Sequence, residues 1–477
     1  MVARLSPHPI PGPRPLPLVG WRGNALLYAR DPLGRLTSLH RAYGDLVALA
    51  AGGNGNLTSA VPGCRGTVFV FGPEHHRTIL TNTALFPIST RTGLEKSQWA
   101  RLGSGIFNKN GEPHRRQRRL LLPAFHRDRM AAYHRDMVAL TMHALEAWRP
   151  GRRDLAQDMH RLTLDIACRA LFGLNGGRES DDLGGLLQTA LRLARAPAVL
   201  LAPLDLPFTP YRRYLRVARR VDEALSGLIA RRRTEGAGGG DVLSAMVRAV
   251  DADGGLTEDE LVGQANALFL AAHETSASAL TWAVFLLAQH PAVLADLLDE
   301  LQTTFGGDGI APERLEELPL LDRVVRESLR LFPPVPILTR VTAADTVLGR
   351  CQLPAATELH LSIYHTHHAE KLYPQAQRFL PDRWKTAAPS PYEYLPFGVG
   401  SRLCVGAGFA LLEIKTVLAL LLRRWRIQIV PGARIDRRVG VTLAMRRGLP
   451  VIVAPPVGPP PQRTALRGDV HEIVDLT

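Results

Sequence analysis

The chain has few cysteines and no recognisable leader. Its 477 residues include four cysteines, Cys64, Cys168, Cys351 and Cys404, and no two of them have a CxxC spacing. This spacing argues against a disulfide framework or a zinc site and favours a reducing compartment, which we take to be the cytoplasm. Prolines recur through the first twenty residues without an apolar signal core, so we expect neither a secretory signal nor a helical membrane anchor there.

Long uncharged runs are also scarce. One stretch, between Glu260 and Asp296, has Glu274 as its only charge and is long enough to span a bilayer. A carboxylate in the middle of the lipid is costly, so a helix buried in a protein core explains the pattern better.

No nucleic-acid, flavin, nicotinamide or iron–sulfur module is recognisable either. The net charge is +14, but the arginines are spread along the whole chain. An arginine-rich proteome produces the same balance, so the charge alone does not indicate a nucleic-acid partner.

Helical periodicity dominates the rest of the chain. A capping box at Thr257 and Glu260 begins a long helix that we expect to continue to about Gln289. We expect one mainly α domain with small β-sheets over 1–477, a proline-rich lead-in at 1–20 and a disordered tail at 456–477. Strand-like pieces fall within 46–72 and 334–365, and a closing hairpin is expected at 436–454. The other predicted helices cover 25–45, 129–149, 154–172, 183–196, 211–233, 291–305, 318–332 and 406–425.

Cys404 lies in the most informative segment, FGVGSRLCVG from Phe397 to Gly406, directly before a long apolar helix. A thiolate is the metal-binding form of cysteine, and its pKa falls near a helix N-terminus or a cation such as Arg402. Gly400 and Gly406 permit a tight turn and a close backbone approach. The segment therefore predicts a thiolate that binds iron and leaves the opposite face of the metal open.

Four further motifs accompany this cysteine. Each combines residue types that can pair on one helix face or in one buried cluster. They are His114 with Arg118 at i and i+4, the acid–alcohol pair Glu274-Thr275 halfway along the long helix, Glu327 with Arg330 at i and i+3, and Arg383 in Phe379-Leu380-Pro381-Asp382-Arg383-Trp384.

Together these motifs resemble those of the cytochrome P450 family of haem-thiolate monooxygenases, from about Pro11 to Pro455. The cysteine segment matches the family pattern FxxGxRxCxG at all five fixed positions. The resemblance implies the cytochrome P450 fold, with haem b between the long central helix and the helix that follows Cys404. It also implies a monomer that works on a small molecule and O2.

The family's site roles carry over at the matching positions. Cys404 is similar to the proximal iron ligand, which pushes electron density onto iron and favours O–O cleavage. Glu327, Arg330 and Arg383 resemble a buried ion network with a structural role. A buried structural cysteine at 404 and a solvated basic helix face at His114 are the alternatives. The remaining haem contacts implied by the resemblance are Phe397, Arg402, His114, Arg118, Arg340, Ala271 and Gly406.

Glu274 and Thr275 resemble the family's distal pair, which delivers protons during oxygen reduction. A threonine in the middle of a helix can instead bond back to the preceding turn. The chain departs from the family at Ala272, where glycine is common, and at Ser276, where threonine is common. These departures put the rate and coupling of the reaction in doubt rather than the fold. His273 is expected to face away from the site.

The resemblance implies insertion of one oxygen atom into a hydrophobic compound, such as a terpenoid, polyketide or fatty-acid derivative of secondary metabolism. We expect apolar pocket walls at 85–108, 190–210, the helix before Ala272, 335–339 and 441–443. The alternatives are a peroxide-driven or non-oxidative haem-thiolate enzyme, and a haem-binding sensor without turnover.

Electrons must come from a separate protein, because the chain carries no redox module of its own. The resemblance implies a ferredoxin or flavodoxin with its reductase. Arg115, Arg116, Arg119 and Lys415 are expected to form a basic patch that attracts such an acidic donor.

Overall fold

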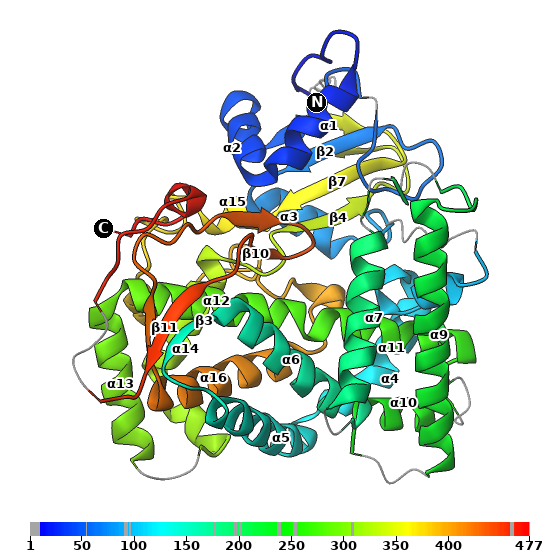
Figure 1. Cartoon of the computed structure of the whole chain (residues 1–477). Helices are drawn as coiled ribbons and strands as arrows, with labels where there is room; N and C mark the ends of the chain where they lie inside the picture. The colour runs from blue at the N-terminus through cyan, green and yellow to red at the C-terminus, as the bar shows by residue number, and fades with distance from the viewer. Residues whose placement is uncertain are drawn as a thin grey trace.

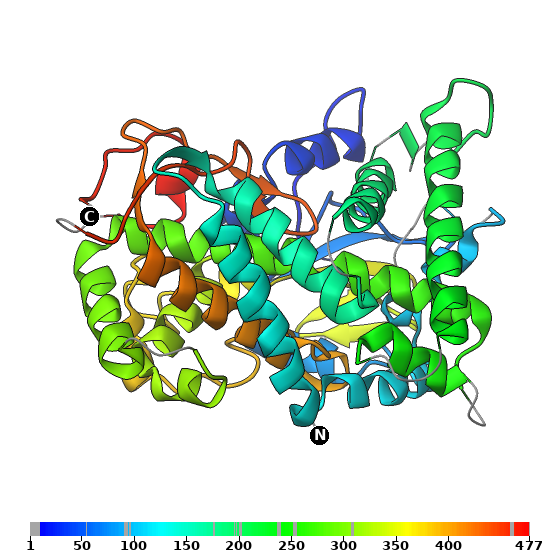
Figure 2. The ribbon, with the colours of Figure 1, turned by 60° about the horizontal axis from the view of Figure 1, so that its bottom comes forward.

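A computed structural model describes residues 10–53, 55–89, 94, 97–174, 177–194, 196, 198–199, 203–235, 240–250, 255–306, 310–457 and 462–476. Helices form most of the molecule. Figure 1 shows the largest sheet and helices α1 and α2 at one end, with the helical body beside them. Figure 2 shows α16, in orange, running through the middle of that body.

The α-helices confirm most of the predicted ones. The helix at 25–45 is two helices, because Asp31 accepts a hydrogen bond from the Gly34 amide and Pro32 follows it at the start of α2. The bounds are α1 Trp21–Arg30, α2 Pro32–Tyr43, α3 Pro73–Thr81, α4 Gly111–Leu121, α5 Arg127–Glu146, α6 Leu155–Phe172, α7 Arg178–Ala194, α9 Pro210–Thr234, α10 Val242–Val250, α11 Glu258–Ala272, α12 Glu274–Gln289, α13 Pro291–Phe305, α14 Pro319–Leu331, α15 Ile363–His367 and α16 Ala407–Arg424.

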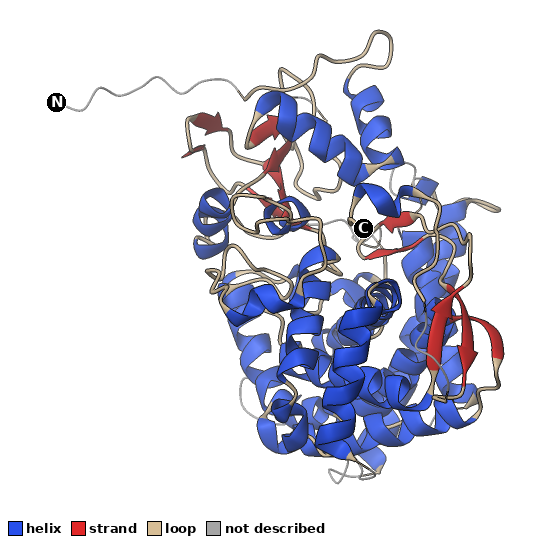
Figure 3. Ribbon diagram, turned by 90° about the vertical axis from the view of Figure 1, so that its left-hand side faces the viewer, coloured by secondary structure: helices blue, strands red, loops and turns tan. Residues whose placement is uncertain are grey.

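The strands form small sheets at the margins of the helical body (Figure 3). The largest has the order β1-β2-β7-β4, in which β2 and β7 are parallel and the other pairs antiparallel. β11 pairs with β3 and β8, β9 with β10, and β5 with β6. The bounds are β1 Leu46–Ala48, β2 Gly66–Val70, β3 Gly151–Asp154, β4 Ile337–Val341, β5 Thr346–Leu348, β6 Cys351–Leu353, β7 Thr357–Ser362, β8 Arg426–Ile429, β9 Arg437–Val439, β10 Leu443–Met445 and β11 Pro450–Ala454.

The long central helix is interrupted at His273, which the sequence did not predict. The His273 carbonyl accepts from the Ala277 amide at 2.9 Å and from the Thr163 hydroxyl at 3.1 Å. Its imidazole bonds to the Phe269 carbonyl at 2.9 Å, and the Thr275 hydroxyl donates to Ala271 at 2.7 Å. Side-chain bonds of this kind compete with the helical ladder, so the break falls directly before Glu274.

The core holds α12 against its neighbours. α12 is buried along almost its whole length. Trp282 stacks on Phe332, just after α14, with ring centroids 3.9 Å apart, and its indole N–H donates to the Leu443 carbonyl at 2.9 Å. This ring stacking and the indole hydrogen bond together fix the position of α12 relative to α14 and β10.

Two predictions about the C-terminal part are wrong. The closing hairpin covers only β9 and β10, because β11 pairs with β3 and β8 in another sheet. Residues 462–476 are not a disordered tail, because Val470, Ile473, Val474 and Leu476 are buried in the main hydrophobic core. The tail is polar in composition, but these apolar side chains bury enough surface to hold it against the core.

Within the described residues, no single helix is long and apolar enough to cross a membrane. The segments Glu258–Gln289 and Pro291–Phe305 satisfy the criteria only as a pair, and they are bent by 110° relative to one another.

Candidate functional site

The Cys404 loop is built on two glycines with left-handed backbone. Gly398 has φ 70° and Gly400 has φ 68°, which other residues adopt only with strain. The loop closes where the Cys404 amide donates to the Phe397 carbonyl at 2.9 Å. Gly406 was predicted to be needed for the turn, but it has φ −90°. A Cβ there would meet only Phe125, at 3.7 Å, so the protein's own geometry does not require glycine at 406.

The pKa of the Cys404 thiol corrects the sequence-based argument. Cys404 is accessible to solvent, yet the surrounding protein desolvates its sulfur and raises the pKa. The Gly406 amide acts in the opposite direction, as predicted for a helix start, but more weakly. The cation that also lowers the pKa is Arg118, whereas the sequence predicted Arg402. The chain alone therefore does not hold a thiolate. A metal ion bound to the sulfur would remove the proton outright.

Arg402 and Arg118 join the Cys404 loop to the region of α4. Arg402 donates to the Ile106 carbonyl at 3.3 Å, to the Asn110 side chain at 2.7 Å and to the Lys109 carbonyl. Arg118 donates to the Leu403 carbonyl at 2.6 Å. Both guanidinium groups are thus held beside Cys404 by neutral oxygen atoms, which leave the positive charge uncompensated.

Four basic groups therefore lie near one another. Burial and Arg402 lower the pKa of Arg340 to about 10, and burial and Arg118 lower that of Arg402 to about 10. Burial, then Arg402 and Arg118, lowers the pKa of His114 to about 4. The Arg340 Nε is buried without a partner. In the described part of the chain, no carboxylate forms an ion pair with these four groups. Such a cluster fits an anionic group such as the two propionates of haem.

The predicted ion network is present, and its members Glu327 and Arg330 are fully buried. Arg330 donates to Glu327 at 2.8 and 2.9 Å, and Arg383 donates to Glu327 at 2.9 Å. The Trp384 indole and the Leu380 amide donate to the same carboxylate at 2.9 and 3.1 Å. Five hydrogen bonds thus satisfy a carboxylate whose side chain is 0% exposed. A buried charge persists only with such complete pairing.

His367, which the sequence reading missed, links this network to the segment before Cys404. Arg330 uses its remaining N–H groups on the carbonyls of His367, Ala376 and Arg378. Burial and Arg330 lower the pKa of His367 to about 3, so the imidazole is neutral. It therefore donates through Nδ1 to the Arg330 carbonyl at 3.2 Å and accepts the Leu395 amide at Nε2, at 2.8 Å. The signal in the sequence was three histidines within 365–368.

Glu274 and Thr275 were predicted halfway along one long helix, but they lie at the start of α12, directly after the break. Thr275 bonds to the Ala271 carbonyl, which is the alternative considered for a threonine within a helix. Burial lowers the pKa values of His160 and His273, and the nearby Glu274 opposes this effect only in part. His273 is fully buried and packs against Phe269 and His160, and its predicted orientation away from the site stays a prediction.

Glu413 was also missed. It lies on α16 beside Ser276, and neither carboxyl oxygen has a hydrogen-bond partner among the described residues. Burial raises its pKa to about 8, against the opposing effect of Ser276. The group is therefore mostly protonated at neutral pH. A lone acid in the apolar stretch 409–422 was the available signal.

The predicted basic patch is smaller than expected. Arg116 pairs with Glu260 at 2.5 Å and Lys415 pairs with Asp322 at 2.7 Å, and their side chains are only 27% and 17% exposed. Both are thus structural cations. Arg119 is exposed, and Arg115 is exposed and paired with Glu112 at 2.7 Å.

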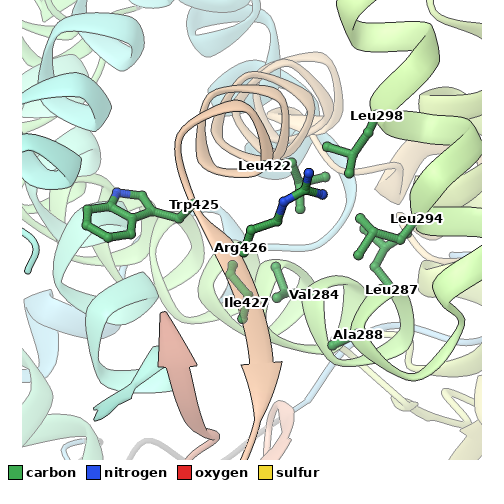
Figure 4. Close-up of a pocket in the computed structure, with 9 residues that line it drawn as sticks. All are labelled: Val284, Leu287, Ala288, Leu294, Leu298, Leu422, Trp425, Arg426 and Ile427. Carbon is green, nitrogen blue, oxygen red and sulfur yellow. The ribbon is translucent and has the colours of Figure 1, made fainter. Parts of the chain in front are cut away.

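Figure 4 shows an apolar pocket between the ends of α12 and α16 and the adjoining α13. Its volume is about 10 Å³, which is room for a single water molecule, so it does not hold a substrate. It is lined by Val284, Leu287, Ala288, Leu294, Leu298, Leu422, Trp425, Arg426 and Ile427.

Comparison with known proteins identifies the same family along the chain. The family model described as cytochrome P450 matches residues 10–447. The chain is 35% identical to cyclooctatin synthase of Streptomyces melanosporofaciens, over 90% of this chain and 92% of that protein. It is 32% identical to pentalenene oxygenase of Streptomyces avermitilis, over 88% of this chain and 92% of that protein.

Solved structures agree in fold. Retinoic acid-bound cyanobacterial CYP120A1 superimposes with a TM-score of 0.80 at 24% identity, covering 94% of this chain and all of the other. The haem domain of cytochrome P450DA gives 0.79 at 23% identity, covering 96% of this chain and 100% of that domain.

The buried network yields a prediction. Replacing Glu327 with alanine leaves Arg330 buried without its counter-charge, which should lower the free energy of unfolding by about 3–5 kcal/mol. Urea unfolding followed by circular dichroism measures this loss. Glu317→Ala, which removes an exposed acid facing Arg314, is the matched control and should change stability by less than about 1 kcal/mol. Equal losses in the two variants would contradict the structural role of Glu327.

Proposed function

Because the chain belongs to the cytochrome P450 family, and so is a haem-thiolate monooxygenase acting on hydrophobic small molecules, we propose that Cys404 binds the haem iron through its sulfur. The observation that carries this proposal is the cluster of basic groups around the Cys404 loop without a carboxylate partner. Haem b would supply two propionates as the missing anions. Arg340, Arg402, His114 and Arg118 would hold them, and Phe397, Ala271 and Gly406 would contact the ring.

Haem, when bound, would supply the site for O2 binding and for its reduction with delivered electrons. The protein's part is to hold the ligand and to move protons. The Cys404 loop presents the sulfur on a backbone fixed by Gly398 and Gly400. At α12, we propose that the Thr275 hydroxyl releases the Ala271 carbonyl and holds a proton near the reacting oxygen. Glu274, which lies near His160, would then supply a new proton to the Thr275 hydroxyl.

We propose a cyclic terpenoid as the substrate. The support is the similarity to two relatives, cyclooctat-9-en-7-ol 5-monooxygenase of Streptomyces melanosporofaciens at 34% identity and pentalenene oxygenase at 32%. The expected apolar walls at 85–108 and 190–210 fall partly outside the described residues, so the pocket itself stays a prediction. A hydrocarbon ring system suits apolar walls, which select by shape. Peroxide-driven or non-oxidative chemistry stays the alternative and is less consistent with the Glu274-Thr275 pair.

The substrate proposal is tested with the purified haem-containing protein. Cyclic diterpene and sesquiterpene alcohols, a long-chain fatty acid and a macrolactone are each titrated, and the Soret band is followed for a spin-state change. We expect a shift with a cyclic terpenoid, and a product heavier by one oxygen atom when an electron donor and O2 are added. A shift with the fatty acid alone would overturn the terpenoid assignment. A colourless protein that takes up no haem would overturn the whole proposal.

Thr275 gives a second test. In Thr275→Ala, we expect product formed per O2 consumed to fall by roughly one to two orders of magnitude, with hydrogen peroxide released instead. Thr275→Ser keeps the hydroxyl and should retain most of the coupling. If both variants coupled as well as the wild type, the hydroxyl would have no part in proton delivery.

We propose a ferredoxin or flavodoxin as the electron donor, docking near Arg115 and Arg119. Both side chains are exposed on α4, whose Arg118 contacts the Leu403 carbonyl. Arg115→Glu with Arg119→Glu should slow reduction by an acidic ferredoxin and flatten its salt dependence. The control reverses Arg213 and Arg216, which are exposed on α9. If the ferredoxin reduced both double variants at the same rate, Arg115 and Arg119 would have no role in docking the electron donor.

We also propose that the enzyme works in the cytoplasm. The four cysteines are free thiols in the structure, and two of them, Cys168 and Cys351, are buried. Unpaired thiols of this kind persist in a reducing compartment.

A further inference from the structure

The C-terminal segment 462–476 lies beyond the part of the chain that matches the family, which ends at residue 447. We call it the C-terminal clamp. It follows β11 and passes beside the segment that leads into the β9–β10 hairpin (Figure 1). Its backbone bonds there are regular: the Ile435 amide donates to the Arg467 carbonyl at 2.8 Å, and the Arg467 amide donates to Ala433 at 2.9 Å. Gly468, with φ 110°, passes so close to Ile435 that a Cβ would lie 2.2 Å from its carbonyl oxygen.

Arg437, the first residue of β9, is the centre of the contact. Its side chain is 6% exposed and faces three carboxylates from two ends of the chain. The guanidinium lies 3.0 Å from Asp31 at the start of α2, 2.9 Å from Glu472 and 3.9 Å from Asp469. The Arg437 amide also donates to Asp469 at 2.7 Å. Two of the three acids that neutralise this buried cation therefore belong to the clamp.

The hairpin that Arg437 anchors is joined to both sides of the candidate site. In β10, the Leu443 carbonyl accepts from Ser278 at 2.5 Å, one turn beyond Thr275 on α12. The Leu443 amide donates to the Pro334 carbonyl at 2.9 Å, at the start of the segment that leads to Arg340 in β4. A displacement of β9 would therefore reach α12 through the Ser278 hydroxyl and the segment before β4 through the backbone bond to Pro334.

The far end of the clamp has its own anchors. Ile473 and Val474 are fully buried, and the Asp475 amide donates to the Gln377 carbonyl at 2.8 Å. The next residue, Arg378, offers its carbonyl to Arg330 of the buried network. Both ends of the clamp thus contact elements that adjoin the site, and neither end contacts the site itself.

We propose that the C-terminal clamp positions the β9–β10 hairpin through Asp469 and Glu472 on Arg437, and so helps to set which ligands fit beside the haem. These two acids are positioning residues, because they act on the site only through Arg437 and β10. The inference rests on the proposed function, since it requires that the chain binds haem with a ligand pocket next to α12.

The test uses the haem-containing full chain with Asp469→Asn and Glu472→Gln together. Two azoles that bind haem iron, imidazole and the much bulkier econazole, are titrated by difference spectroscopy well below the melting temperature. We expect the ratio of their dissociation constants to change by about fivefold or more, the lower end of usual couplings between sites. The control is Glu146→Gln with Glu317→Gln, which neutralises two exposed acids that each face one arginine. Its ratio should equal that of the wild type.

A clamp variant that melts at a lower temperature but keeps the wild-type ratio would overturn the inference, because the clamp would then only stabilise the fold. A matching change in the control would also overturn it, as a general effect of charge. Failure of the wild type to bind haem would overturn the proposed function and the inference with it. Normal haem uptake with an unchanged ratio overturns the inference alone.

Discussion

The site depends on a cluster of basic groups with which no carboxylate of the described residues forms an ion pair. Arg340, Arg402, His114 and Arg118 are arranged by the backbone of β4, α4 and the Cys404 loop, and the bonds that hold the arginines are donated to neutral oxygen atoms. Burial first, and then the neighbouring guanidinium groups, lower the pKa values of Arg340, Arg402 and His114. A bound dianion would relieve this cost, so binding of the cofactor and stability of this part of the fold should be linked.

The Glu327 network solves the opposite problem. There a carboxylate lies between the two arginines. Arg330 directs its N–H groups to Glu327 and to three carbonyls, and His367 extends the chain of bonds to Leu395. A neutral histidine can accept and donate at once, which a protonated one cannot. The Glu327 network therefore fixes, through His367 and Leu395, the segment that leads into the Cys404 loop.

Local sequence motifs predicted many of the candidate site residues. The remaining features depend on pairs of residues that are far apart in the sequence. Glu327, Arg330 and Arg383 were identifiable because their spacing recurs in a known family, and the structure brings them together. Arg116 and Lys415 were wrongly predicted to belong to an exposed basic patch, because the local sequence does not indicate partners as distant as Glu260 and Asp322. The break at His273 depends on Thr163 from another helix.

The tail was misread for a related reason: its composition is polar, but a few apolar side chains find a core made by distant segments. Helix positions, in contrast, followed from periodicity and caps, and α6, α13, α14 and α16 begin and end within a residue or two of the expected places. Amphipathic pattern is local, whereas ion pairing and strand exchange between sheets are not, which is why β11 was assigned to the wrong partner.

The central claim is that Cys404 and the surrounding basic cluster hold a haem through a sulfur–iron bond. X-ray absorption at the iron edge of the purified resting protein tests it most directly, because it reports sulfur in the first coordination sphere whatever the substrate. The account predicts one sulfur ligand at about 2.3 Å, the usual length of a metal–thiolate bond. It also predicts loss of this sulfur in Cys404→Ser. Iron bound only by nitrogen and oxygen in the wild type would contradict it.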